Sequence, residues 1–287
     1  MHTIRLSVAL ALLLGSLGCG KKDGPATTKD SKVEMLEPKT SPSSATLPPV
    51  DAAPALAAAK NLLKAIQEGK ATSANFTQSF KSAIAPPELG ADRAEGFAES
   101  GVRQWLGQLK WEGGTTAATL KFANADYAIV KTPYSQGEKD GSANVYIWIL
   151  RQGSEWIIAD LLIDQVFGQF NIPDGEQAGP AFAAWSFSQA VREKSMPKVE
   201  ARLTRALKAK LAPPNFDEDK VQGYSSSSLK SAFSELFATP LGISSVELTG
   251  AAAKVNVTTG GVKKILEIKL VPGASSGEFL IDDYQQK

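Results

Sequence analysis

Residues 81–87 read Lys-Ser-Ala-Ile-Ala-Pro-Pro, and residues 208–214, which lie 127 positions further along the chain, read Lys-Ala-Lys-Leu-Ala-Pro-Pro. The match continues at the same spacing through a further set of identical or similar residues: Asp92 with Asp219, Arg93 with Lys220, Gly96 with Gly223, Phe97 with Tyr224, Ser100 with Ser227, Leu106 with Phe233 and Leu109 with Leu236. A constant spacing over so many positions indicates an internal duplication. With small gaps, 65–68 also matches 190–193, and 155–160 matches 278–283. The sequence therefore predicts two homologous domains, at residues 55–170 and 178–287.

Each repeat is predicted to begin with helices. In the first repeat, apolar residues recur at helical spacing over 53–68, 76–84 and 102–109. Gly69 follows the first of these segments, and Pro86-Pro87 follows the second, which are typical helix stops. In the second repeat, the same reasoning predicts helices near 181–194, 198–211 and 226–237.

Strands are predicted after the helices in both repeats. Beyond Gly113-Gly114 apolar residues alternate with polar ones, and the turns between the alternating segments are rich in Gly, Asn and Asp. The predicted strands lie near 120–122, 127–129, 145–149 and 156–158, and then near 243–249, 252–258, 262–270 and 277–284. The fold class that we predict is α+β, with about three helices packed on a four-stranded antiparallel meander in each repeat.

This order of elements, closed by Trp156-Ile-Ile in one repeat and Phe279-Leu-Ile in the other, resembles the nuclear-transport-factor-2-like, or cystatin-related, α+β superfamily. The resemblance covers both repeats. It implies a cone-shaped fold that is used by isomerase-type enzymes, by dehydratases and by non-catalytic binding domains. A fold of this kind leaves the function open.

The first nineteen residues are typical of an export signal. Arg5 precedes an apolar run over 6–14, which is too short to span a bilayer, and small residues follow it. The Gly18-Cys19 pair resembles the lipobox of bacterial lipoproteins, although Ser16 stands where that family usually has Leu. The resemblance implies that residues 1–19 are a lipoprotein signal with its lipidation site, that Cys19 carries the lipid, and that the exported protein is anchored to the inner or outer membrane of the cell envelope.

Residues 20–54 are rich in Pro, Ser, Thr and Lys and carry few aliphatic side chains. Such a composition predicts a disordered linker that holds the two domains away from the membrane surface.

The composition excludes several classes of site. The chain has one Cys, and its one His, His2, lies in the predicted signal. Intramolecular disulfides, multi-Cys zinc sites and His-based catalytic sites are therefore not expected. The 31 basic and 30 acidic residues leave no basic footprint for nucleic acid. Since no phosphate, dinucleotide or calcium motif is present either, we expect no cofactor and no metal.

An isomerase-type site would need a carboxylate base and a hydroxyl donor in the cavity of the cone. In the first repeat the candidates are Tyr127, Tyr146 and Asp160. Their counterparts in the second repeat are Ala253, a residue near Glu267, and Asp283, so the repeats do not share the tyrosines. We therefore predict no catalytic residue. The repeated Ala-Pro-Pro element with its Asp and Gly is predicted to be structural, because capping and turn formation account for each of its positions.

The sequence thus favours a lipid-anchored, non-catalytic module that binds an unidentified protein or small molecule. An isomerase or dehydratase and a purely structural envelope component remain as alternatives. A duplicated chain could also pair its two open sheet faces as an internal pseudo-dimer. That arrangement would bury a first set of strand residues against a second: Val145, Ile147 and Ile149 against Val262, Ile265 and Ile268.

Overall fold

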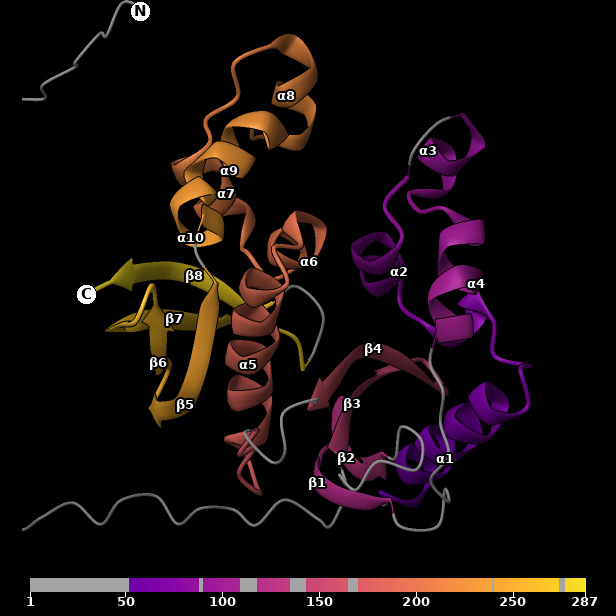
Figure 1. Cartoon of the computed structure of the whole chain (residues 1–287). Coiled ribbons are helices and arrows are strands. Elements are labelled where there is room, and N and C mark those ends of the chain that lie inside the picture. The colour runs from indigo at the N-terminus through magenta and orange to yellow at the C-terminus, as the bar shows by residue number, and fades with distance from the viewer. Residues whose placement is uncertain are drawn as a thin grey trace, which may run out of the picture. The chain divides into compact units, whose positions relative to one another are not determined.

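A computed structural model describes residues 52–287 except 88–89, 109–117, 135–142, 165–169, 239 and 274–276 (Figure 1). The described residues belong to one compact unit, Leu47–Lys287. The predicted signal, Cys19 and nearly all of the predicted linker lie outside them. Within the described part of the chain, the helices lack the combination of length and apolar composition that crossing a bilayer requires.

The two repeats have the same order of helices and strands. The first contains α1 (Ala53–Gln67), the 3₁₀ helix η1 (Ser73–Asn75), α2 (Gln78–Ile84), α3 (Ala91–Glu95), α4 (Glu99–Gln108), β1 (Thr119–Ala123), β2 (Tyr127–Tyr134), β3 (Ala143–Gln152) and β4 (Glu155–Asp164). The second contains α5 (Ala178–Arg192), α6 (Met196–Ala201), α7 (Arg205–Leu211), α8 (Asp217–Gln222), α9 (Ser226–Ala232), α10 (Ser234–Ala238), β5 (Leu241–Thr249), β6 (Ala252–Thr259), β7 (Val262–Pro272) and β8 (Phe279–Gln286). The strands form two antiparallel sheets, the first sheet (β1-β2-β3-β4) and the second sheet (β5-β6-β7-β8). The predicted α+β fold with two tandem meanders is confirmed.

Two predicted helices, 198–211 and 226–237, are interrupted, so the prediction of a single helix in each place was wrong; the second divides at Phe233 into α9 and α10. Between α6 and α7 the backbone leaves the helical path and forms a parallel bridge from Leu203 to Ile281 of β8. Thr204 N–H donates to the Ile281 carbonyl at 2.9 Å. The first repeat has the same bridge, from Phe76 to Ile158 of β4, with Thr77 N–H donating at 2.8 Å. In both repeats, the residues just before α2 and α7 therefore pair with the last strand of the sheet, although the spacing of their apolar side chains is helical.

The duplicated segment adopts the same local structure twice. Thr77 and Thr204 cap α2 and α7 through their hydroxyl groups, which accept hydrogen bonds from the N–H three residues later. Gly96 and Gly223 end α3 and α8 with φ of 76° and 86°, a left-handed conformation that favours glycine. Every one of these features recurs at the spacing of 127 residues, and each stabilises a helix end or a turn.

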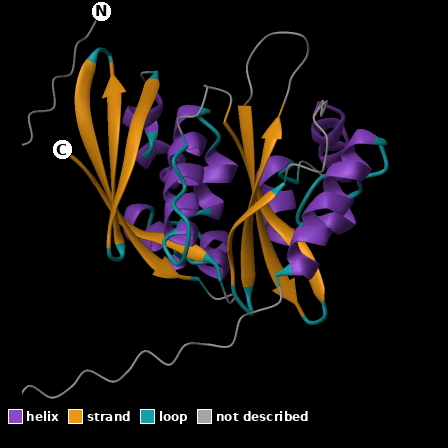
Figure 2. Cartoon of the chain, turned by 90° about the horizontal axis from the view of Figure 1, so that it is seen from below, coloured by secondary structure: helices purple, strands orange, loops and turns teal. Residues whose placement is uncertain are grey.

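The first sheet is covered on both faces. On one face its strand residues pack with α1 in a separate core that includes Val145, Ile147 and Ile149. On the other face Tyr146 and Trp148 belong to a larger core that contains α5 and the buried side of the second sheet. Helix α5 therefore lies between the two sheets (Figure 1), and Figure 2 shows helices in the space between them.

The expected packing of the two sheets on each other was wrong. Val145, Ile147 and Ile149 point toward α1, while Ile268 points toward α5. Val262 and Ile265 are 59% and 37% exposed. A helix, and not the second sheet, occupies the face that was expected to pair.

Sequence differences between the repeats explain this order of layers. In α5, Phe182 and Trp185 stand where the equivalent positions of α1 have the small Ala57 and the charged Lys60, so α5 is apolar on both sides. In the sheets, Trp148 of β3 pairs with Asp160, whereas Lys269 of β7 pairs with the equivalent aspartate. The first sheet thus has two apolar faces to bury, and the second has only one.

Candidate functional site

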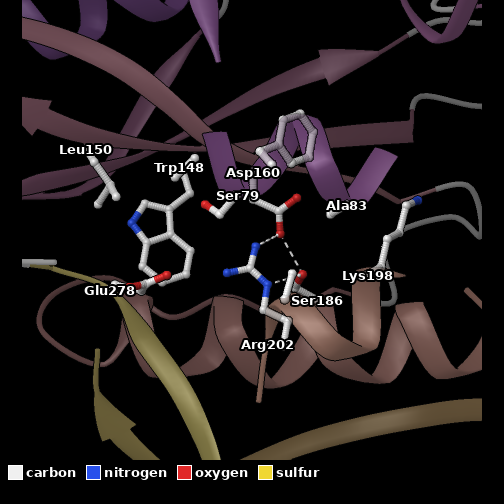
Figure 3. Close-up of a pocket in the computed structure, with 12 residues that line it drawn as sticks. Ser79, Ala83, Trp148, Leu150, Asp160, Ser186, Lys198, Arg202 and Glu278 are labelled. Atoms are coloured by element: carbon white, nitrogen blue, oxygen red, sulfur yellow. Dashed lines mark hydrogen bonds and ion pairs between the residues drawn. The ribbon is translucent and has the colours of Figure 1, made fainter. Parts of the chain in front are cut away.

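A buried ion pair joins the two repeats. Asp160 of β4 contacts the guanidinium of Arg202, which directly follows α6, and the two residues are 7% and 9% exposed (Figure 3). The hydroxyl of Ser186 on α5 donates to Asp160 Oδ2 at 2.6 Å and accepts from Arg202 Nε at 3.1 Å. Asp160 Oδ1 accepts from the N–H of Leu161 at 2.8 Å. Both carboxylate oxygens of Asp160 are therefore engaged.

Trp148 supports this ion pair from the first sheet. The guanidinium carbon of Arg202 lies 5.4 Å from the centre of the Trp148 ring, within the range of a cation–π contact. These groups, together with Ser79 and Glu278, line a small cavity of about 30 Å³. It is far below the roughly 300 Å³ at which small-molecule sites begin.

A larger cavity of about 330 Å³, the inter-repeat cavity, is also lined by Asp160 and Ser186. Its walls come from α2, α4 and β4 of the first repeat and from α5, α6 and the turn between them in the second. The residues that line it are Phe80, Ile84, Trp105, Gln108, Asp160, Leu161, Leu162, Ile163, Ser186, Gln189, Ala190, Glu193 and Lys198.

Three charged residues line this cavity: Glu193 and Lys198 pair with each other, whereas Asp160 pairs with Arg202, which does not line it. Lys198 Nζ donates to Glu193 Oε2 at 2.7 Å, and Gln189 Nε2 donates to Glu193 Oε1 at 2.6 Å. Gln189 Oε1 is buried and has no hydrogen-bond partner among the described residues. The charged groups of the lining are therefore two carboxylates and one ammonium group.

The two candidate tyrosines lie in the core that the repeats share. The hydroxyl of Tyr146 donates to the Phe170 carbonyl at 2.8 Å. The Tyr127 ring packs against Phe279 of β8, with 6.1 Å between ring centres. A Cβ atom placed on Gly179 of α5 would lie 2.8 Å from the Tyr127 hydroxyl, which shows how closely α5 approaches this sheet.

Both tyrosines are held in the protonated form at neutral pH. Burial, together with the nearby Glu176, raises the pKa of Tyr127 to about 12. Burial also raises the pKa of Tyr146 to about 12, with Asp164 and Asp174 adding to the effect. Neither tyrosine lines either of the cavities beside Asp160. The structure thus places Asp160 at the inter-repeat cavity and the two tyrosines in the packed core.

Sequence reasoning did not identify Arg202, Ser186 or Trp105. At the spacing of 127 residues, the counterpart of Arg202 is Asn75, so this position is charged in only one repeat. Such a difference suggests that Arg202 has a role between the two repeats, and it was the signal in the sequence that could have identified this residue. The signal for α5 was its apolar composition on two sides. Among the described residues, no group of three His, Cys, Asp or Glu side chains could hold a metal ion.

No protein-family model and no curated protein sequence matches the chain. Among solved structures, the chain is similar to an NTF2-like protein involved in plasmid conjugation, with a TM-score of 0.22 and 10% identity over 73% of this chain and 93% of that one. It is also similar to a cystatin-like protein from Ruminococcus gnavus ATCC 29149, with a TM-score of 0.21 and 10% identity over 80% of this chain and 91% of that one. Both likenesses are weak and concern the fold alone.

Proposed function

We propose that the protein is a lipid-anchored component of the bacterial cell envelope whose two repeats form a non-catalytic module, and that this module binds a small ligand in the inter-repeat cavity. The observation that carries the binding role is the cavity of about 330 Å³ itself, with aromatic side chains from the first repeat and polar side chains from both repeats in its walls. Its volume lies at the lower end of the roughly 300–1,000 Å³ typical of small-molecule sites. A purely structural component has no need of such a cavity.

The state of Asp160 favours binding over acid–base catalysis. A general base needs a carboxylate oxygen within hydrogen-bond reach of the substrate. In this structure one oxygen accepts from Leu161 N–H, and the other is shared by Ser186 and Arg202. The tyrosines that an isomerase would use as donors are packed between the sheet and α5. The carboxylate therefore serves as a link between the repeats.

The cavity is tested with the mature chain and a panel of small neutral, anionic and cationic solutes, by differential scanning fluorimetry. We expect at least one solute to raise the melting temperature of the wild type and to lose this effect in Gln108→Ala, because Gln108 is exposed and lines the cavity.

Gln104→Ala is the matched control, since Gln104 is an exposed glutamine on the same helix that does not line the cavity. A panel in which every stabilising solute acts equally on Gln108→Ala and on the wild type would place binding elsewhere and overturn this assignment.

The anchor is tested by Cys19→Ser. Several acyl chains on Cys19 would hold the protein on a membrane, at about 0.8 kcal/mol for each buried CH₂. We expect the variant to lose metabolic labelling with palmitate and to move from the membrane fraction to the soluble fraction. Ser16→Leu, which restores the usual lipobox residue, should keep both the label and the membrane fractionation. Unchanged labelling of Cys19→Ser would refute the lipid anchor.

A further inference from the structure

The ligand class can be narrowed from the charged residues of the inter-repeat cavity, on the premise that this cavity is the binding site proposed above. Among the described residues that line it, Asp160 and Glu193 are acidic and Lys198 is basic. Asp160 is buried, and both of its oxygens are engaged by Arg202, Ser186 and the backbone (Figure 3). The Glu193 side chain is 36% exposed. Glu193 is therefore the carboxylate that a ligand can reach.

The Glu193 carboxylate is oriented by a contact within its own helix. Glu193 is the C-cap residue of α5, and Gln189, one turn earlier, donates from Nε2 to Glu193 Oε1 at 2.6 Å. The second oxygen, Oε2, accepts from Lys198 Nζ of α6 at 2.7 Å. If Lys198 turned away, Gln189 would still hold the carboxylate in place. The site thus has an acceptor whose position does not depend on Lys198.

The contact between Lys198 and Glu193 can be exchanged for a contact with a ligand. Both side chains are about a third exposed, and exposed ion pairs contribute little to stability. Lys198 carries its charge on a flexible stem, so that the ammonium group can turn into solvent. The ammonium group of a ligand has the same three donors and can occupy the same place on Glu193 Oε2.

An anionic ligand meets the opposite situation. It would draw Lys198 away from Glu193 and leave that carboxylate without its cation, in a cavity that Asp160 also lines. Glu193 also lies at the C-terminal end of α5, a helix of 15 residues. The C-terminal end of a helix carries a partial negative charge, which favours a cation and disfavours an anion. The charges of the cavity therefore favour a cationic ligand.

The wall that faces these groups from the first repeat is mainly apolar. Trp105 lines it, partly exposed, and is held by edge-on contacts with Phe76 and Phe80, whose ring centres are 6.0 and 5.5 Å away. At the spacing of 127 residues the counterpart of Trp105 is Ala232, so the aromatic ring is present in only one repeat. The aliphatic residues of the same wall are Ile84, Leu161, Leu162 and Ile163. The cavity thus has an apolar side and a carboxylate.

We infer that the inter-repeat cavity binds an amphipathic primary amine, whose ammonium group bonds to Glu193 in place of Lys198 and whose apolar part packs against Trp105 and Ile84. The volume of about 330 Å³ lies at the small end of ligand sites, which suits one aromatic ring or a short alkyl chain. The carboxylate at the end of α5 selects the charge of the ligand, and the wall of the first repeat selects its apolar part.

The test is isothermal titration calorimetry of the mature chain with four probes of similar size. Phenethylamine and hexylamine are the amphipathic amines, 2-phenylethanol is the neutral counterpart, and 3-phenylpropionate is the anionic one. We expect saturable binding of at least one amine, and binding of the alcohol and of the carboxylate that is weaker by about tenfold or more, because neither can replace the ammonium group on Glu193.

Two variants that break the same ion pair should have opposite effects. Glu193→Gln should weaken amine binding by about tenfold or more, because it removes the charged acceptor. Lys198→Ala should strengthen amine binding by about threefold, because the ligand no longer displaces an internal ammonium group. A variant that acted only through loss of the ion pair would change binding in the same direction as the other.

The duplication supplies the matched control for Glu193. Glu68 is its counterpart, the C-cap residue of α1, and pairs with Lys70 at 2.8 Å without lining the inter-repeat cavity. Glu68→Gln should therefore bind the amine as the wild type does. Gln108→Ala should weaken the amine by about threefold, since Gln108 lines the same cavity.

The possible outcomes separate the two proposals. If the alcohol or the carboxylate binds, with loss in Gln108→Ala, and neither amine does, the amine inference fails while the cavity remains the binding site. If an amine depends on Gln108 but binds equally well to Glu193→Gln and to the wild type, the same conclusion holds. Equal weakening by Glu193→Gln and Lys198→Ala would also overturn the inference. If no probe and no panel solute depends on Gln108, both proposals fail.

Discussion

Replacement of Arg202 by alanine is expected to lower the free energy of unfolding by about 3–5 kcal/mol, because the change leaves the buried Asp160 carboxylate without its cation. The two side chains are almost completely removed from solvent, and Ser186 hydrogen-bonds to both. Arg202 also contacts the ring of Trp148, so the substitution removes packing as well as charge. Urea denaturation of the mature chain at neutral pH measures the difference.

The duplication supplies a matched control for this prediction. Asp283 is the counterpart of Asp160, and its partner is Lys210, at 3.1 Å, in an ion pair whose side chains are 66% and 36% exposed. Lys210→Ala is expected to cost no more than about 1 kcal/mol, since exposed pairs contribute little. Equal costs for Arg202→Ala and Lys210→Ala would contradict the role assigned to the buried pair. The double variant Asp160→Leu/Arg202→Met should recover most of the lost stability, because it removes both charges.

Replacement of Trp185 by alanine is expected to cost about 3–5 kcal/mol, the range for removing a large buried aromatic side chain. Trp185 is 1% exposed, and its ring centre lies 4.6 Å from that of Phe170 in the core between the sheets. Chemical denaturation monitored by circular dichroism measures the loss.

Lys60 of α1 is the control for Trp185, because it occupies the equivalent position on the first helix and faces no second sheet. Lys60 is half-buried, and Lys60→Ala is expected to cost no more than about 1 kcal/mol, well below the loss for Trp185→Ala. Phe182→Ala should behave like Trp185→Ala, since Phe182 is fully buried with its ring centre 5.1 Å from that of Trp148. A small loss in both α5 variants would mean that α5 is not held between the sheets.

The parts of the fold that could be predicted are those with strong local patterns. The alternation in β3 and β7, the prolines after α2 and α7, and the glycines at positions 96 and 223 each fix local structure through short-range chemistry. The order of helices and strands follows from such patterns. The spacing of 127 residues then carries each assignment from one repeat to the other.

The relation between the repeats could not be predicted in the same way. The open faces of two related sheets suggested direct pairing, but Phe182 and Trp185 gave α5 a second apolar side, and a helix filled the space. The partner of Asp160 lies 42 positions away along the chain, on an element that sequence reasoning treated as part of a longer helix. Contacts of this kind depend on how the elements meet, which a local pattern does not contain.

The position of α5 has a consequence for biosynthesis. While the chain is being made, the first sheet is complete at Asp164, yet the cover over Tyr146 and Trp148 on its second face is incomplete until α5, which begins at Ala178, has also emerged. An uncovered apolar sheet face is a site of aggregation during folding. Because α5 is the next described element in the sequence after β4, this face is left incompletely covered only while the short segment between β4 and α5 is being made. A chain truncated before α5 would keep that face exposed, so the first repeat depends on the beginning of the second to become a soluble product.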